Sequence, residues 1–283
     1  MSCDPDWDDE VDVVCTDSGV AGLATAISAV DEDGEVFVAE SQPARPSPSV
    51  GQPRGWFELC GDVATDEYLG ELTADIDLAS LTFHGADMPV RLAGEPLPPR
   101  RRPIPTFEGW RLREWAARCI PSPTGYLYTQ VTDWTSTTTD FGNEELLTIA
   151  EIGETTVDPE RPCGSVRDWL VSEALARDVI PHPVASFDGL VFEDGKVCGA
   201  KFSTAYGSRM IRARHGVLIC RNRTDAELVL DSLLPGDAPL RVALVGKEAS
   251  RFGRVELLTS DPEVAAMARP SQEQPGSVTF SRS

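Results

Sequence analysis

The residues with the clearest chemical potential form one short turn near the start of the chain, Thr16-Asp17-Ser18-Gly19-Val20-Ala21-Gly22. The spacing approaches the GxGxxG fingerprint, whose three glycines serve a tight turn, the close approach of a diphosphate, and helix–strand packing. Gly19 and Gly22 supply the second and third glycines, whereas Asp17 stands at the first. Glu40 follows 23 residues after Asp17, where an acidic side chain can hold ribose hydroxyls. If a dinucleotide is bound, the predicted binding residues are Ser18, Gly19, Gly22 and Glu40.

Asp17 argues against a bound dinucleotide. A carboxylate ~5 Å from a phosphate charge, at an effective dielectric constant of ~20, repels that charge by roughly 3 kcal/mol. This repulsion corresponds to about a hundredfold in affinity for each contact. Packing alone also explains Gly19 and Gly22, because a helix that lies close to a strand needs residues without a side chain. We therefore favour packing over cofactor binding for both glycines.

Other reactive groups are scattered along the chain. Tyr126 and Tyr128 could donate protons, but neither a GxSxG nucleophile elbow nor a GxxxxGK[ST] phosphate loop occurs. The three histidines, His84, His182 and His215, are isolated, and the seven cysteines are not spaced like zinc ligands. We predict no metal site and no disulfide framework, and the catalytic residues of any reaction stay unknown.

The composition excludes several classes of partner. Asp and Glu number 46 against 25 Lys and Arg, which gives a formal net charge of −21. Nucleic acids and anionic membranes attract basic proteins, so neither is expected as a partner. The N-terminal sequence lacks a signal pattern, and no apolar run approaches the ~18 residues that cross a bilayer. A cytoplasmic protein without a membrane span is therefore expected.

One basic cluster stands out against the excess of acid, Arg100-Arg101-Arg102, between prolines. It has two explanations: a solvated loop that offsets nearby acidic residues, or a contact with an anion or a protein partner. The sequence is compatible with both explanations of this cluster.

The elements that must position the fingerprint form a strand–helix–strand unit. The apolar run 11–15 predicts a strand, residues 19–30 carry apolar side chains at helical spacing, and 35–40 predict another strand. Gly34 is the expected C′ residue at the end of this helix. The fingerprint turn therefore joins the first strand to the helix.

Further elements follow along the chain. A helix is expected over 65–81, with Thr65 as its N-cap, and residues 121–164 are expected to be rich in loops. An Asp-Gly turn indicates a hairpin within a three-stranded meander. The remaining expected elements are helices at 112–119, 166–174 and 225–234, meander strands at 190–192, 197–202 and 210–213, and buried strands at 216–220 and 240–245.

This alternation of strands and helices predicts an α/β fold with a Rossmann-like, mainly parallel sheet, a β-meander and an inserted loop-rich lobe. The expected organisation is an acidic tail at 1–10, a dinucleotide-binding-like first part at 11–81, an inserted lobe at 82–180, the meander and the return to the sheet at 181–260, and a C-terminal tail at 261–283.

Four stretches of the chain resemble the FAD-dependent fumarate reductase/succinate dehydrogenase flavoprotein family, which includes 3-ketosteroid dehydrogenases. They are EVDVVCTDSGVAGLATAISA, EVFVAES, TDEYLGEL and DGLVFEDGKVCGAKFSTAYGSRMIRARHGVLIC, and the match covers about half of the chain. The resemblance implies a Rossmann-like FAD/NAD(P)-binding sheet. It also implies that any bound cofactor is FAD, with its pyrophosphate at Gly19 and Gly22 and its ribose at Glu40.

The chain departs from this family beyond Asp17. The family's returning strand ends in a Gly-rich turn against the cofactor, whereas here Cys220 is followed by Arg221-Asn222-Arg223. The residues that follow are also too few for the family's capping domain and second cofactor-binding segment. These departures predict a degenerate homologue that binds no cofactor and has no catalytic activity.

Three functions stay open. The first is a structural or partner-binding subunit, with a protein partner or as a homo-oligomer. The second is a minimal FAD-dependent oxidoreductase, a dehydrogenase or reductase of steroid-like or other enone substrates. The third is a binder of a small ligand without redox chemistry.

Overall fold

The computed structural model describes residues 6–41, 61–78, 81, 88–96, 109–130, 136–141, 145–220 and 239–267 of the 283. Several sequence-based expectations lie outside these residues, namely His84, Arg100-Arg101-Arg102, the segment Arg221-Asn222-Arg223 and the helix at 225–234.

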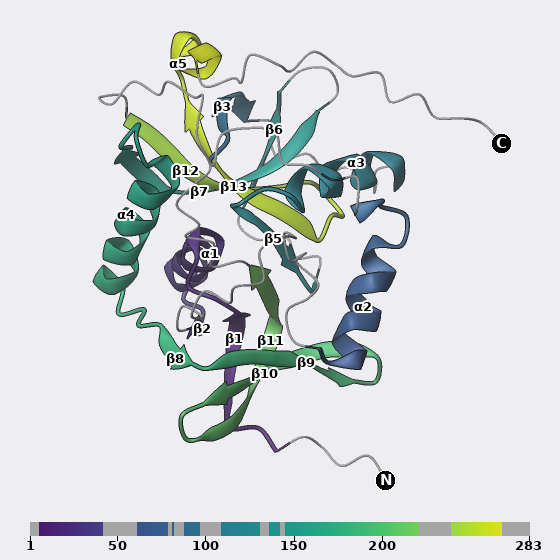
Figure 1. The fold of residues 1–283 in the computed structure, drawn as a ribbon. Helices are drawn as coiled ribbons and strands as arrows, with labels where there is room; N and C mark the ends of the chain where they lie inside the picture. The colour runs from purple at the N-terminus through teal and green to yellow at the C-terminus, as the bar shows by residue number, and fades with distance from the viewer. Residues whose placement is uncertain are drawn as a thin grey trace, which may run out of the picture.

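The strand–helix–strand unit of the fingerprint is confirmed (Figure 1). Strand β1 (Asp9–Cys15) leads into helix α1 (Val20–Asp31), and β2 (Val36–Ser41) returns beside β1. The two strands pair in parallel, with Val14 opposite Phe37. Asp9 and Glu10 belong to β1, although they lie within the range expected as an acidic tail.

Helix α1 ends in a Schellman motif whose register differs from the expected one. The N–H of Asp33 donates to the Val30 carbonyl at 3.0 Å, and the N–H of Gly34 donates to the Ala29 carbonyl at 2.8 Å. Asp33, with a φ of 63°, is therefore C′, and Gly34 is C″. The prediction of Gly34 as C′ was wrong by one position. Space at C″ explains this glycine, because a Cβ there would lie 2.9 Å from the Ala29 oxygen.

All thirteen strands of the described residues join one mixed sheet, which confirms an α/β fold. The path runs β4-β6-β7-β12-β13-β5-β11-β1-β2-β8, with β10 and β9 continuing from β11, and β3 beside β13. The other bounds are β3 (Val90–Leu92), β4 (Glu95–Pro96), β5 (Gly125–Tyr128), β6 (Thr137–Asp140), β7 (Leu146–Thr156), β8 (His182–Val184), β9 (Ser186–Glu193), β10 (Lys196–Thr204), β11 (Gly207–Cys220), β12 (Pro239–Gly246) and β13 (Phe252–Thr259).

The expectation of a mainly parallel sheet was wrong. Four of the strand pairs are parallel and eight are antiparallel. The parallel character is concentrated around β1, whereas β5, β7, β12 and β13 pair antiparallel with one another or with β11. Short turns, such as the one from β12 to β13, join antiparallel strands without a crossover helix. Residues 121–164, expected to be rich in loops, contain strands β5, β6 and β7.

The meander is confirmed as β9, β10 and β11. Asp194 and Gly195 have φ values of 49° and 74°, as a tight turn between antiparallel strands requires. The two separate strands expected at 210–213 and 216–220 are one strand, β11. It continues through Gly216, whose φ of 133° accompanies a register shift against β1. Gly216 therefore accommodates a bulge within one continuous strand, where two strands were predicted.

Helix α2 (Val63–Thr73) is shorter than the expected 65–81, and its N-cap is Asp62. The Asp62 carboxylate accepts from the Thr65 N–H at 2.9 Å and from the Thr65 hydroxyl at 2.7 Å. Thr65 is therefore not the N-cap, and its Oγ1 accepts from the Leu190 N–H at 2.8 Å, which ties α2 to β9. The other helices are α3 (Gly109–Cys119) and α4 (Pro162–Ala176), both as expected, and α5 (Pro262–Met267), which lies in the range expected as a C-terminal tail.

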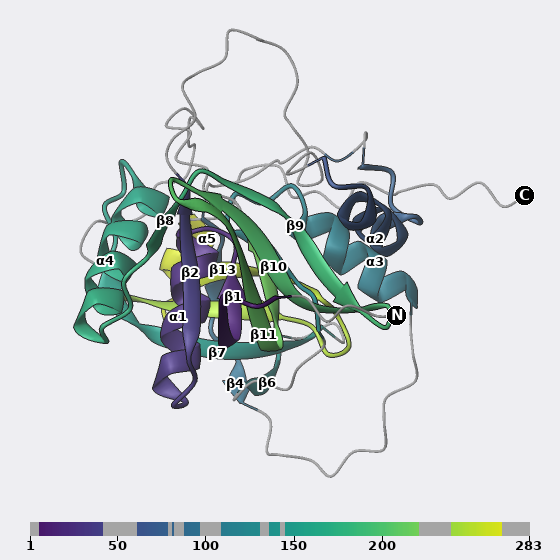
Figure 2. The same ribbon diagram turned by 90° about the horizontal axis from the view of Figure 1, so that it is seen from below.

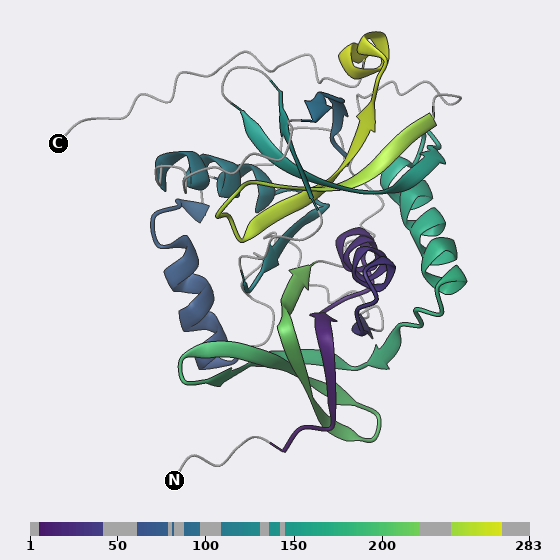
Figure 3. The same ribbon diagram turned by 180° about the vertical axis from the view of Figure 1, so that it is seen from behind.

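Two apolar cores lie on the two faces of the sheet, because successive side chains of a strand point to opposite faces. On β1, Val14 joins one core with Trp115, whereas Val13 and Cys15 join the other with α1 and α4. Val11 shares the core of Val14 because the register of β1 shifts between Val11 and Val13. Helix α1 packs between β1, the strands β7, β12 and β13, and α4 (Figure 1). Helices α2 and α3 lie on one flank and α4 on the opposite flank (Figures 2 and 3).

No helix in the part of the chain that the structure describes is long and apolar enough to span a membrane.

Candidate functional site

The candidate site is the turn between β1 and α1. Ligands of parallel sheets bind at the carboxyl ends of the strands, and this turn has that position. The end of β11 lies beside it: the Cys220 N–H donates to Thr16 Oγ1 at 3.3 Å, and the Thr16 N–H donates to the Leu218 carbonyl at 3.0 Å. Every residue of the turn from Thr16 to Gly19 is buried.

The Asp17 carboxyl lies at the start of α1 with its side chain buried, so that the residue is only 7 % exposed. Burial raises its pKa to about 7, although the Ser41 hydroxyl, the N–H groups of Ser18 and Gly19, and Arg167 of α4 act to lower it. The backbone N–H groups that begin a helix attract anions. The Asp17 carboxyl therefore lies at the helix start, where a diphosphate would accept hydrogen bonds, and its Oδ1 has no hydrogen-bond partner within the described residues.

This geometry changes the expected reason for excluding a diphosphate. The sequence-based estimate treated Asp17 as fully charged, whereas a carboxyl with a pKa of about 7 is about half protonated at neutral pH. The space that the buried Asp17 side chain occupies at the helix start, more than charge repulsion alone, disfavours a phosphate there.

The two glycines of the fingerprint differ, because the structure requires a glycine at only one of the two positions. A Cβ on Gly22 would lie 1.9 Å from the Asp17 carbonyl oxygen and 3.2 Å from the Cys220 sulfur, so Gly22 is required for packing. Gly19 is the N-cap of α1, with φ −68° and ψ 179°, an extended conformation that any residue adopts. Contact within the protein therefore explains Gly22 without a ligand, and the conformation of Gly19 requires no glycine.

The remaining predicted site residues lie on the same edge of the sheet. Ser18 is 1 % exposed, and its hydroxyl has no hydrogen-bond partner within the described residues. Glu40 is exposed near the end of β2, which is the parallel neighbour of β1. The fold thus brings Ser18, Gly19 and Gly22 into one turn and places Glu40 on the adjacent strand end. Whether any of them binds a cofactor stays a prediction.

These residues do not fit the diphosphate of FAD as the turn stands. A bound diphosphate needs free backbone N–H groups and space at the helix start. The Asp17 carboxyl is buried at that helix start, and the contact of Gly22 with the Asp17 carbonyl and Cys220 leaves the turn closely packed. No redox step is therefore derived from this turn.

The two candidate tyrosines lie on β5, which pairs with β11, so that Tyr126 is opposite Cys220 at the strand end beside the fingerprint. The Tyr128 hydroxyl donates to the His215 carbonyl at 2.8 Å. Burial raises the pKa of both Tyr126 and Tyr128 above the usual value of a phenol. Both tyrosines line a cavity that also borders the turn between β12 and β13, at Lys247 and Arg251. Sequence analysis missed this cavity, because nothing in the spacing of 247–251 connects it to β5.

The described residues contain no group of three or more His, Cys, Asp or Glu side chains that could hold a metal ion. His182 instead stacks on Phe37 with ring centroids 4.6 Å apart, and His215 lies 3.5 Å from Asp12. The cysteines that the structure describes are free thiols.

No protein-family model and no curated protein matches this chain. Solved structures resemble it distantly. The 3-ketosteroid-Δ4-(5α)-dehydrogenase from Rhodococcus jostii RHA1 is 17 % identical, with a TM-score of 0.30 over 75 % of this chain and 46 % of that one. A myxobacterial chondrochloren halogenase, described as a variant of FAD-dependent halogenases, is 15 % identical, with a TM-score of 0.28 over 73 % and 36 % of the two chains.

A geranylgeranyl bacteriochlorophyll reductase-like protein from Thermoplasma acidophilum is 13 % identical, with a TM-score of 0.27 over 87 % of this chain and 56 % of that one. The similar structures are thus a steroid dehydrogenase, an FAD-dependent halogenase and a reductase-like protein. This chain spans at most about half of the length of these proteins. The resemblance to the fumarate reductase/succinate dehydrogenase family stays a prediction.

Proposed function

We propose that this chain is a non-catalytic homologue of FAD-dependent oxidoreductases and acts as a structural or partner-binding subunit. The observation that carries the proposal is the Asp17 carboxyl buried at the start of α1, where the backbone N–H groups of Ser18 and Gly19 act to lower its pKa. An internal carboxyl at the helix start competes directly with a diphosphate for the same donors.

Exposed apolar side chains support the partner-binding part of the proposal. Leu175 near the end of α4 is 55 % exposed, and Ile180, just beyond the helix, is 67 % exposed. Large apolar side chains that lie close together on a surface are common at protein–protein interfaces. The formal charge of −21 favours a partner with a basic surface over nucleic acid or an anionic membrane.

The test of the non-catalytic role is whether the full chain binds FAD. We expect the purified protein to show no flavin absorbance near 450 nm and no heat signal when titrated with FAD. Glu40→Gln, which alters an exposed side chain on the same sheet edge, is the matched variant and should behave as the wild type does. A stoichiometric flavin band in the wild-type protein would overturn the proposal.

Native mass spectrometry of the chain isolated from the cells that produce it tests the partner-binding role. We expect a mass above that of the single 30.6 kDa chain, from a second protein or from further copies of this one. A monomer with nothing attached, at concentrations where weak complexes persist, would contradict this part.

The alternative is a minimal FAD-dependent oxidoreductase that acts on steroid-like or other enone substrates. It is favoured by Ser18 Oγ and Arg167 Nε, two buried polar atoms near Asp17 that have no partner within the described residues. In this case Gly19, Gly22 and Glu40 would hold the cofactor. The wild-type protein would then bind FAD, and Asp17→Gly should tighten that binding at least tenfold, since it removes the competing carboxyl.

A further inference from the structure

A cavity of about 90 Å³ lies apart from the fingerprint turn. We call it the α1–β5 cavity, because it is bounded by Thr25 and Ser28 in the middle of α1, by β5, and by the turn 247–251 between β12 and β13. One water molecule needs roughly 10–15 Å³ of cavity volume, so the cavity holds on the order of six water molecules. That volume suits a small organic molecule.

Thr25 places a buried, unsatisfied hydroxyl beside this cavity. Thr25 is 4 % exposed and lines the cavity, and its Oγ1 has no hydrogen-bond partner in the part of the chain that the structure describes. Thr73 of α2, also 4 % exposed, shows the usual arrangement, in which the hydroxyl donates to the Leu69 carbonyl at 2.9 Å. A buried hydroxyl without a partner costs about 1–3 kcal/mol. A helical threonine populates two χ1 rotamers, so a rotation can turn the Thr25 hydroxyl towards a molecule in the cavity.

Arg251 adds a positive charge to the wall. Its Nη1 donates to the Tyr68 hydroxyl at 2.9 Å, and it forms no ion pair with a carboxylate among the described residues. A guanidinium has five N–H donors and binds carboxylates well, so Arg251 retains donors for an anion. Lys247 also lines the cavity, as does the exposed Glu248, so the wall holds two cationic side chains and one carboxylate. The remaining polar lining is largely hydroxyl groups, among them those of Tyr126, Tyr128 and Ser250.

We propose that the α1–β5 cavity binds a small hydroxy acid, with its carboxylate at Arg251 and its hydroxyl at Thr25. A ligand that lacks the hydroxyl leaves Thr25 unsatisfied, and a ligand that lacks the carboxylate gains nothing from the guanidinium. This site does not depend on the fingerprint turn, so it stands whether or not the chain binds FAD.

The first test compares three small probes on the full chain by titration calorimetry or NMR. Lactate carries both groups, propionate lacks the hydroxyl, and 1,2-propanediol lacks the carboxylate. We expect lactate to bind at least tenfold more tightly than either of the other two. Equal binding of the three probes, or no binding of lactate, would overturn the proposal.

The second test assigns the two groups. Thr25→Val keeps the shape of the side chain and should abolish the preference for lactate over propionate. Arg251→Gln should abolish the preference for lactate over 1,2-propanediol. Thr73→Val is the matched control in another helix and should retain both preferences.

The stability of Thr25→Val provides an independent measurement. Because its hydroxyl lacks a partner, the unliganded variant should unfold at no lower a denaturant concentration than the wild type, whereas Thr73→Val, which loses a hydrogen bond, should unfold earlier. A Thr25→Val protein that keeps the preference for lactate over propionate would contradict the assignment of the hydroxyl.

Discussion

At the scale of single residues, Asp17 is the most informative position in the chain. It lies where the fingerprint has its first glycine, and it is not among the described residues with a positive φ, so the backbone accepts an aspartate there. Burial of the Asp17 side chain is what is unfavourable, because desolvation disfavours the charged form of a carboxyl. The same buried residue therefore underlies the proposed exclusion of a phosphate and makes the stability of the protein depend on pH.

This pH dependence can be measured. The folded-state pKa of Asp17 is raised from its usual 3.8 to about 7, so the folded state binds more protons than the unfolded state between these values. Its contribution to the free energy of unfolding is therefore present at low pH and is lost as the pH rises through about 7. Asp17→Asn should reduce the difference in free energy of unfolding between pH 5 and pH 8 by roughly 2–3 kcal/mol, as measured by urea unfolding.

The control is Glu40→Gln, because Glu40 is an exposed carboxylate on the same sheet edge. It should follow the wild-type profile. If the profiles of Asp17→Asn and the wild type run parallel from pH 5 to pH 8, Asp17 is not protonated in this range.

At the scale of elements, α1 depends on burial and not on its own end signals. Its N-cap Gly19 makes no side-chain cap bond, no acidic residue lies in its first turn, and no basic residue lies in its last turn. Most of its twelve residues are buried, including Leu23 and Ile27. A helix of this length is marginal in isolation, so packing against β1, β12 and α4 stabilises it.

The end of α1 offers a specific test. Asp33 is held at a φ of 63°, where a residue with a Cβ is disfavoured and glycine is not. Asp33→Gly should therefore raise the free energy of unfolding by about 0.5–1 kcal/mol, measured by urea unfolding at neutral pH. Glu32→Gly is the control, because Glu32 has a φ of −102° and gains nothing from glycine. Equal losses of stability in the two variants would show that the left-handed conformation is not what limits α1.

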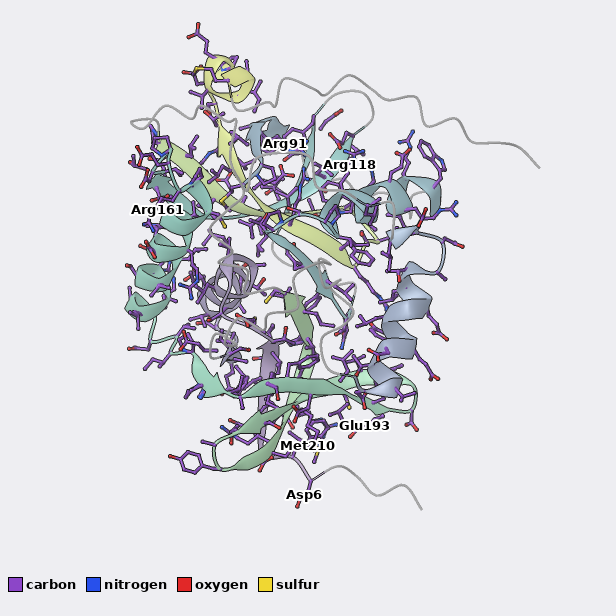
Figure 4. All side chains as sticks on the ribbon, viewed as in Figure 1. Asp6, Arg91, Arg118, Arg161, Glu193 and Met210 are labelled. Atoms are coloured by element: carbon purple, nitrogen blue, oxygen red, sulfur yellow. The ribbon has the colours of Figure 1, made fainter. Side chains whose placement is uncertain are left out.

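At the scale of the whole molecule, a chain of ion pairs links parts of the sequence that lie far apart. Glu256 on β13 is fully buried and accepts from Arg91 Nε of β3 at 2.6 Å and from Arg254 Nε at 2.7 Å. Arg91 also pairs with Glu145 at 3.0 Å, and Arg118 of α3 pairs with the same carboxylate at 2.9 Å. Figure 4 shows Arg91 and Arg118 in the same part of the molecule, beside the outer strands of the sheet. This network fixes β3 and α3 on β13.

Removing its buried carboxylate should be costly. Glu256→Gln leaves the guanidinium of Arg254 without its carboxylate and leaves Arg91 with Glu145 alone, so the free energy of unfolding at pH 7 should fall by roughly 3–5 kcal/mol. The two arginines lower the pKa of Glu256 to about 2, despite a desolvation that acts to raise it. The stability that Glu256 contributes is present above pH 4.5 and is lost as the pH falls towards 2. The difference in free energy of unfolding between Glu256→Gln and the wild type should therefore be smaller at pH 3 than at pH 7, by roughly 1–2 kcal/mol.

Glu151→Gln is the matched control for this measurement. Glu151 on β7 pairs with Arg241 at 2.6 Å, but its side chain is 47 % exposed, so its loss should cost at most about 1 kcal/mol. If Glu256→Gln and Glu151→Gln cost the same, the buried network adds nothing to the stability of the fold.

Local patterns were sufficient to predict much of the fold. The apolar run before Cys15, the helical spacing up to Val30, and the Asp194-Gly195 turn each depend on neighbours in the chain. Helices α3 and α4 were likewise predicted, because their periodicity lies within one short segment. The fingerprint turn was found in the same way, since its residues are consecutive.

Long-range contacts decided the rest. The antiparallel pairing of β5, β7, β12 and β13, and the choice of Asp62 over Thr65 as N-cap, depend on which segments meet in space. The sequence determined that an aspartate follows β1 in place of a glycine. Only the tertiary structure decided that this carboxyl is buried and that Thr25 lacks a partner, because burial and hydrogen-bond partners come from residues remote in the chain.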